Sequence, residues 1–303
     1  MKVRIGFGPG TGAAGMAAAD FAEMVDALEA EGFDSLWLSE RLTGQSFDPV
    51  VGLSFAAGRT RRIKLGTSVM VLPGRNPVVV AKELATLDVL CGGRLLPAFG
   101  LGVAEPAEQQ AFGVAREERA AWFDEALPLI RRLWTEEAVD HDGPRFQLQG
   151  VSIGPRPVQH PPDVWLGGRA PSELRRVGRL GDGWLPSFCT PAEAEAGREE
   201  IEKVAAETGR SIDPEHFGAL VVYSAGPMPE RLRAALQLRR PGVDPAAVVP
   251  VGHEALRTRL EEFVARGFSK FVPVPAGAPA SWSGELSQLA SAVLDLQTQR
   301  RST

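Results

Sequence analysis

The sequence predicts a single (β/α)8 barrel, a TIM-type α/β fold, that spans residues 1–303. Strand-like and helix-like patterns alternate along almost the whole chain, which is typical of a parallel sheet with crossover helices. Eight such strands favour a closed barrel over an open sheet, because a closed sheet leaves no edge strand to protect. The length of 303 residues is ordinary for one barrel of this kind.

The first half of the chain carries four of the expected strand-helix units. The strands are expected over residues 3–7, 36–38, 63–72 and 95–100. The first helix covers about residues 17–30, and the next two begin with the cap-and-proline pairs Asp48-Pro49 and Asn76-Pro77. The fourth helix covers about residues 116–135, and Pro128 inside it should bend or split it.

The second half begins with an exception to the alternation. Residues 139–162 contain several Gly and Pro residues and no helical period, so they predict an irregular insertion or hairpin before the fifth strand. This insertion is a candidate wall of the substrate pocket. The remaining strands are expected over residues 164–167, 183–187, 217–224 and 270–274. The remaining helices are expected at about residues 171–180, 191–208, 229–239, 253–266 and 283–299.

Charge and cysteine usage narrow the partners and the location. The formal net charge is -5 with no basic stripe, so nucleic acid is not an expected partner. Cys91 and Cys189 lie far apart without metal spacing, which fits a reducing compartment. No run approaches the ~20 apolar residues of a membrane span, and no signal-peptide region precedes the first strand. We therefore expect a cytoplasmic protein without a membrane partner.

Two classes of barrel enzyme lack their motifs in this sequence. The histidines are His141, His160, His216 and His253. They show neither HxH nor HExxH spacing, so we expect no metal site. No GxSxG elbow is present, which argues against a serine hydrolase.

A glycine-rich segment near the N-terminus raises a rival fold. Residues 10–15 match GxGxxG between the first strand and the first helix, as in a Rossmann dehydrogenase that binds NAD(P). The glycines stand several residues beyond the strand, and six further strand-helix units do not fit an open sheet with a substrate domain. We interpret the segment as a loop over the barrel mouth.

A second glycine-rich segment is a better candidate for holding an anion. Gly167-Gly168-Arg169-Ala170-Pro171 lies between a strand and a helix. Glycines let the backbone approach a phosphate there, and free N–H groups with the helix dipole attract it, while Arg169 adds charge. The alternative is a plain turn whose glycines permit tight packing.

Three segments resemble the luciferase-like monooxygenase superfamily, and the resemblance covers most of the chain from residue 3 to residue 274. The first is residues 32–40, GFDSLWLSE. The second is residues 62–94, which contains RIKLGTSV, LP, RNP, AK and GGR in that order. The third is residues 164–186, which contains VWLGGR and LGDGWLP. Any one segment alone is weak, but the three occur in the family's order. The phrases WLGGR and LGDGWLP resemble the branch that depends on coenzyme F420.

The resemblance implies a barrel that binds F420, or alternatively FMN, with the tricyclic ring at the carboxyl-end mouth. It implies an oxidoreductase that transfers hydride between F420 and a small organic substrate, and a homodimer. The FMN alternative is a monooxygenase that uses reduced flavin and oxygen. A non-catalytic flavin-binding barrel also stays open, because binding and turnover use the same residues.

The resemblance assigns cofactor contacts to three places besides the 167–171 loop. Ser68-Val69 matches a bulge where the family has a non-prolyl cis peptide against the ring. Gly102 lies in the loop after the fourth strand and is expected to contact the cofactor. Trp184 is expected either to stack near the cofactor or to lie in the core.

The resemblance also suggests two carboxylates that handle the proton. Glu40 ends the second strand, where F420-dependent relatives have an acidic residue followed by histidine; here Arg41 follows, which puts a sugar-phosphate dehydrogenase in doubt. Glu105 resembles the proton donor of F420-dependent glucose-6-phosphate dehydrogenases, and partial burial would raise its pKa. Glu108 is a neighbouring competitor. The alternative for each is a solvated carboxylate.

Overall fold

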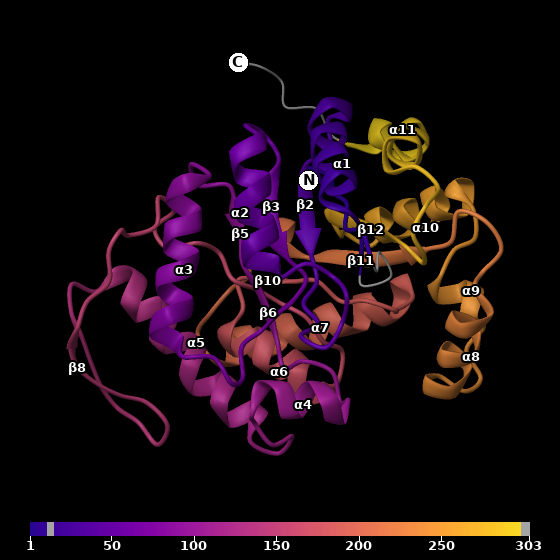
Figure 1. Cartoon of the computed structure of the whole chain (residues 1–303). Coiled ribbons are helices and arrows are strands. Elements are labelled where there is room, and N and C mark those ends of the chain that lie inside the picture. The colour runs from indigo at the N-terminus through magenta and orange to yellow at the C-terminus, as the bar shows by residue number, and fades with distance from the viewer. Residues whose placement is uncertain (11–14, 298–303) are drawn as a thin grey trace.

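The computed structural model describes residues 1–10 and 15–297, and in it the parallel strands form the predicted closed barrel (Figure 1). The strands are β1 Arg4–Ile5, β2 Ser35–Leu38, β3 Lys64–Thr67, β4 Met70–Val71, β5 Leu95–Leu96, β6 Ala98–Gly100, β9 Trp165–Leu166, β10 Gly183–Trp184, β11 Gly218–Tyr223 and β12 Lys270–Pro275. Two of the expected strands are each divided, one into β3 and β4 and the other into β5 and β6.

Strand pairing runs around the whole cylinder. The parallel pairs are β2–β3, β3–β5, β4–β6, β6–β9, β9–β10, β11–β12 and β12–β1. Parallel bridges between Phe7 and Leu36 and between Trp184 and Phe217 join the two remaining gaps. A Rossmann fold is therefore wrong for this chain, because its sheet is open. Residues 11–14 of the GxGxxG segment lie outside the described residues.

Helices surround the strands (Figure 1). They are α1 Ala18–Glu31, α2 Pro49–Arg59, α3 Pro77–Leu90, α4 Pro106–Phe112, α5 Arg119–Thr135, α6 Pro171–Leu180, α7 Pro191–Glu207, α8 Glu230–Arg239, α9 Pro245–Val248, α10 His253–Ala265 and α11 Trp282–Val293, with short 3-10 turns at Pro214–His216 and Leu294–Leu296. The predicted caps are confirmed, because the side chains of Asp48 and Asn76 accept N–H groups in the first turns of α2 and α3. Among the described residues, no helix is long and apolar enough to cross a membrane.

Two helices depart from the sequence prediction. We expected Pro128 to bend or split this helix, and the split is wrong, because α5 runs unbroken from Arg119 to Thr135. Phe123, Leu127 and Ile130 of α5 are buried on both sides of the proline, so their packing outweighs the lost hydrogen bond. The short helix α4 was not predicted, and it lies in the loop that follows β6.

The insertion before the fifth strand is an antiparallel hairpin, β7 Val139–Asp142 with β8 Gln147–Val151. The prediction that it walls the substrate pocket is wrong, since none of residues 139–162 lines either of the two large cavities. The hairpin stands out beside α5 (Figure 1), where Phe146 meets Trp122 edge to face at 5.3 Å. Helix α5 returns the chain from the carboxyl ends of the strands to their amino-terminal ends. A segment that follows α5 therefore begins at the end of the barrel opposite the catalytic mouth.

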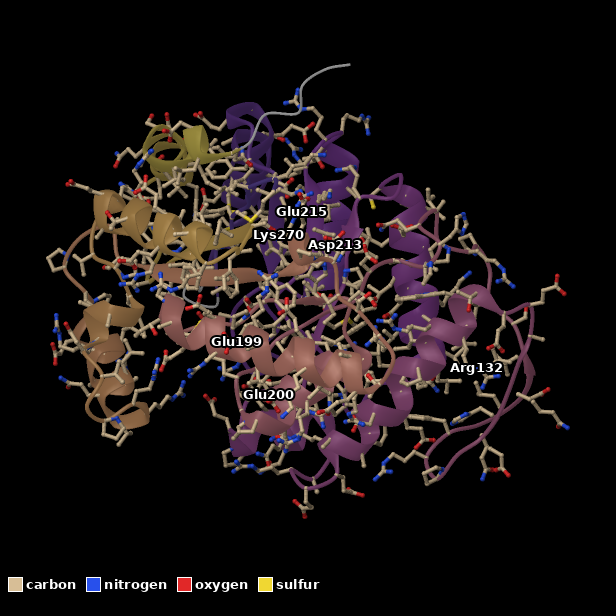
Figure 2. All side chains as sticks on the ribbon, turned by 180° about the vertical axis from the view of Figure 1, so that it is seen from behind. Arg132, Glu199, Glu200, Asp213, Glu215 and Lys270 are labelled. Atoms are coloured by element: carbon tan, nitrogen blue, oxygen red, sulfur yellow. The ribbon has the colours of Figure 1, made fainter. Side chains whose placement is uncertain are left out.

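The amino-terminal end of the barrel holds a buried ion pair. Nζ of Lys270, the first residue of β12, lies 2.8 Å from Oδ2 of Asp34, just before β2. Figure 2 shows Lys270 near Asp213 and Glu215, which precede β11 at the same end. Burial lowers the pKa of Lys270 to about 8, although the carboxylate opposes it. Burial acts to raise the pKa of Asp34, but the ammonium group outweighs it and holds that pKa below its ordinary value.

Candidate functional site at the carboxyl end of the barrel

The carboxyl ends of the strands open onto a cavity of about 460 Å³. Every barrel strand, or the loop after it, contributes to its lining, from Gly10 after β1 to Val274 in β12. Ligand pockets in proteins commonly measure roughly 300–1,000 Å³. The mouth of this barrel therefore has room for a planar ligand.

The peptide bond between Ser68 and Val69 is cis, as the family resemblance predicted. It lies between β3 and β4, and Val69 faces Gly100 and Gly167 across the cavity wall. A Cβ at Gly100 would lie 2.6 Å from Cγ2 of Val69, and one at Gly167 would lie 3.2 Å from Cγ1. The hydroxyl of Ser39, which sequence reasoning missed, donates to the Ser68 carbonyl oxygen at 2.8 Å. Two glycines thus make room for the valine that lines the cavity.

Glu40 lines the cavity and is buried, so its interpretation as a solvated surface carboxylate is wrong. Its carboxylate accepts the Val71 N–H at 2.6 Å and pairs with the guanidinium group of Arg75. Burial raises the pKa of Glu40 above its ordinary value, although Arg75 opposes the change. Arg75 belongs to the RNP segment of the family resemblance, but its partnership with Glu40 was not predicted.

Glu105, just before α4, and Glu108, within it, occupy different environments. Nη2 of Arg41 donates to Glu105 at 2.5 Å, and the Glu105 side chain is 46% exposed and does not line the cavity. Glu105 is therefore partly buried, as expected, but it does not lie at the cavity where we expected the ring. Its competitor Glu108 lines the cavity and accepts the N–H and hydroxyl groups of Thr43 at 2.8 and 2.5 Å. Burial acts to raise the pKa of Glu108, but these bonds and Arg41 outweigh it and hold that pKa low.

The N–H groups of Arg169 and Ala170 in the 167–171 loop are not free, and for these two residues the prediction is wrong. The N–H groups of Arg169 and Ala170 donate to Oε2 of Glu173 at 2.9 and 2.8 Å. A glutamate at the third position of a helix commonly accepts the backbone N–H of the N-cap residue. Glu173 stands in that position after Ala170, so this signal was present in the sequence. Gly168 has φ +95°, and a Cβ there would lie 2.6 Å from Cδ of Glu173. The carboxylate thus stands where we expected a phosphate.

Trp184 and Gly102 have contrasting positions. Trp184 is buried and lines neither large cavity, so the core alternative is correct and stacking on the cofactor is wrong. Its indole N–H donates to the Gly168 carbonyl oxygen at 2.9 Å and so holds the loop. Gly102 lines the cavity with φ +78°. Arg119 fixes the surrounding loop by donating to the carbonyl oxygens of Leu101, Gly102 and Val103 at 3.0–3.1 Å.

A second cavity of about 540 Å³ adjoins the first. Arg169 and Ala170 of the 167–171 loop line this outer cavity, together with residues of α8. Phe188 lines both cavities. Among the described residues, no group of three or more His, Cys, Asp or Glu side chains is arranged to hold a metal ion.

Comparison with known proteins places these features in a family. The luciferase-like monooxygenase family matches residues 1–271. An F420-dependent glucose-6-phosphate dehydrogenase of Kineococcus radiotolerans is 35% identical over 55% of this chain and 51% of its own length. A 5,10-methylenetetrahydromethanopterin reductase of Archaeoglobus fulgidus is 29% identical over 62% of this chain and 55% of its own length. The chain thus spans little more than half the length of these curated relatives.

Solved structures share the fold. An F420-dependent secondary alcohol dehydrogenase matches with a TM-score of 0.82 and 21% identity over 98% of this chain and 100% of the other. The FMN-bound oxygenating constituent of the 3,6-diketocamphane monooxygenase of Pseudomonas putida matches with a TM-score of 0.78 and 16% identity over 99% and 100% of the two chains. At these identities the likeness concerns the barrel alone.

Proposed function

The chain belongs to the luciferase-like monooxygenase family, and from that premise we propose that it is an oxidoreductase that transfers hydride between coenzyme F420 and a small organic substrate. The observation that carries the proposal is the cavity at the barrel mouth, where Val69 packs beside Gly100 and Gly167 on one wall. The curated relatives named as F420-dependent favour F420 over FMN. The cytoplasmic location expected from the sequence is part of the same proposal.

The residues at the mouth fit a tricyclic ring that carries a phosphate. Ser68 and Val69 would lie along the ring, with Gly100 and Gly167 leaving space on the same wall. Gly102 would contact the cofactor from its loop, which Arg119 holds in place. The 167–171 loop would hold the phosphate once Glu173 has turned away from its N–H groups.

When bound, F420 supplies a two-electron centre that gives or takes a hydride rather than activating oxygen. The chain must then supply or remove a proton on the substrate. Glu40 is our first choice, because it lines the cavity and burial raises its pKa. Glu105 is the second choice, and it would first have to leave its ion pair with Arg41. Glu40 itself is buried, so its carboxyl group has little contact with bulk water.

Fluorescence titration with F420, FMN and NADPH, each alone, tests the proposal. We expect F420 to bind most tightly and NADPH not to bind. Val69→Phe should weaken F420 binding about 10- to 100-fold, because filling a packed wall costs ~1–3 kcal/mol. Val158→Phe is the matched control, because Val158 is 49% exposed and lines neither large cavity. Tighter binding of FMN than of F420 would favour the monooxygenase alternative, and no binding of either would end the proposal.

The homodimer that we expect from the family has a candidate surface on α2. Phe47 just before α2, and Val51 and Phe55 on it, follow at four-residue intervals and are 41%, 70% and 45% exposed. Val51 and Phe55 share a helix face, and the rings of Phe47 and Phe55 both lie beside Phe21, at 5.1 and 5.7 Å, so the three side chains form an apolar stripe. Exposed apolar patches commonly mark protein interfaces. We propose that two copies pack through this stripe.

Sedimentation velocity tests this interface. We expect the wild-type chain to sediment as a dimer and Val51→Glu as a monomer, because a charge in an apolar interface loses its hydration. Leu90→Glu is the control, because Leu90 is 69% exposed at the end of α3 and is not part of the stripe. A monomeric wild-type protein, or a dimer that survives Val51→Glu, would contradict the prediction.

A further inference from the structure

Glu173 of α6 lies where the cavity at the barrel mouth meets the outer cavity. It lines both cavities, and so do Gly168 and Arg239. Its Oε2 atom accepts the N–H groups of Arg169 and Ala170, so a carboxylate already occupies the place that the proposed function gives to the phosphate of the cofactor. A phosphate that binds at this loop therefore binds beside a negative charge of the protein.

The charged lining of the outer cavity leaves one net positive charge. Its charged side chains are those of Arg169, Glu173, Arg239 and Arg240. The charge of Arg240 is neutralised by its ion pair with Glu193. Within residues 1–10 and 15–297, no carboxylate pairs with the guanidinium group of Arg169 or of Arg239. Two unpaired guanidinium groups and the Glu173 carboxylate thus complement an anion that carries a single charge.

The space on both sides of Glu173 favours a phosphate that joins two organic groups. The cavity at the barrel mouth, of about 460 Å³, has room for the ring, and the outer cavity adds about 540 Å³ beyond the loop. A phosphate monoester ends at its phosphate, so it would leave Leu232 and Leu236 of the outer cavity against water. A phosphodiester continues past its phosphate and can fill this second space.

We propose that Glu173 selects a cofactor whose phosphate is a diester with a single charge and disfavours a phosphate monoester. The inference rests on the proposed function, because it concerns the phosphate of the cofactor at that site. It adds a physical reason for F420, whose phosphate joins two parts of the coenzyme, over FMN, whose phosphate is terminal. A monoester carries about 1.5 to 2 negative charges at neutral pH, and the additional charge is repelled by the Glu173 carboxylate.

Three ligands that share the deazaflavin ring and ribityl chain of F420 test the proposal. One ends in a hydroxyl group, one in a phosphate monoester and one in the methyl ester of that phosphate. Fluorescence titration at about pH 8, where the monoester carries nearly two charges, gives the affinity of each. We expect the wild-type protein to bind the methyl ester about tenfold more tightly than the monoester, because only the monoester brings a second charge to the loop.

Glu173→Gln removes the charge and keeps the shape of the side chain. A glutamine oxygen can still accept an N–H group at the start of α6, so the fold should survive. The monoester should bind this variant about tenfold more tightly than it binds the wild-type protein, the methyl ester about threefold more tightly, and the hydroxyl ligand equally. Glu254→Gln is the matched control and should change none of these affinities, because Glu254 also lies in the first turn of a helix but lines neither large cavity.

Two results would overturn the inference. In the first, the monoester binds to the wild-type protein no more weakly than the methyl ester. In the second, Glu173→Gln changes all three affinities by the same factor, because the side chain would then act on the shape of the loop and not through its charge. Titration of F420 against the same proteins separates the inference from the proposed function. F420 binding without a charge preference rejects only the inference, whereas a wild-type protein that binds neither F420 nor FMN refutes the proposed function.

Discussion

Asp34→Asn is expected to lower the free energy of unfolding by about 3–5 kcal/mol, because it leaves a buried ammonium group without its partner. The Lys270 side chain is 3% exposed, and Asp34 is its ion-pair partner at 2.8 Å. Urea unfolding measures the loss. The double variant Asp34→Asn with Lys270→Met should recover most of it, because an apolar pair removes the uncompensated charge. A loss no greater than that of Asp26→Asn, which breaks an exposed ion pair with Arg59, would contradict the prediction.

The same variant should depend on pH in a defined direction. The pKa of Lys270 in the folded protein is about 8, below its ordinary value of 10.5, so between these values the unfolded chain binds more protons. The free energy of unfolding therefore rises with pH between about 8 and 10.5. Below about pH 8 the folded protein bears the full cost of burying the charged Lys270 side chain. Without Asp34 the pKa of Lys270 falls further, so the pH range over which stability rises with pH extends to lower values. We expect the loss in Asp34→Asn to be smaller at about pH 9 than at neutral pH.

Glu40→Gln is expected to lower kcat by about 100- to 10,000-fold, the usual range for loss of a general acid or base. A glutamine oxygen can still accept the Val71 N–H, so the fold should survive. Stopped-flow kinetics with F420 measures the change, once a substrate is identified. Glu105→Gln is the matched control and should have a small effect, because Glu105 does not line the cavity. The reverse result, with Glu105→Gln inactive and Glu40→Gln active, would move the proton role to Glu105.

The pH profile of the wild-type enzyme should carry the signature of Glu40. Because burial raises the pKa of this carboxyl group, the limb of the pH–rate profile that it controls should lie above the ordinary pKa range of glutamate. Substrate reduction needs the protonated form, so the rate should fall as pH rises through that pKa. Substrate oxidation needs the carboxylate, so that rate should fall as pH decreases through it. The limb should be absent from Glu40→Gln.

Much of the fold could be predicted from local patterns. The cap-and-proline pairs at Asp48 and Asn76 mark the starts of α2 and α3, because the signals lie within a few residues of each other. Helix α4 was missed because Pro106–Phe112 is too short to show a helical period. The unbroken course of α5 through Pro128 was missed because packing against distant segments overrides the local cost of proline.

The candidate site was predicted in its place and less well in its contacts. Glu40, Val69, Gly102 and Gly167 all line the cavity, as expected for residues at the carboxyl ends of barrel strands. Which acidic residue at the start of α4 faces the cavity depends on the orientation of that helix, and Glu108 rather than the preceding Glu105 does so. The contact of Glu173 with the N–H groups of Arg169 and Ala170 follows from a local pattern at the start of α6, although the prediction took those N–H groups as free.

The sequence by itself determined the alternation of strands and helices, the closed barrel and the end of it that carries the cavity, because these depend on periodicity and chain order. Only the tertiary structure decided the ionic partners of the site. Arg75 pairs with Glu40 and Arg41 pairs with Glu105, across separations of 35 and 64 residues. Such contacts depend on how whole helices are oriented on the barrel, and no pattern within a short window of sequence specifies that orientation.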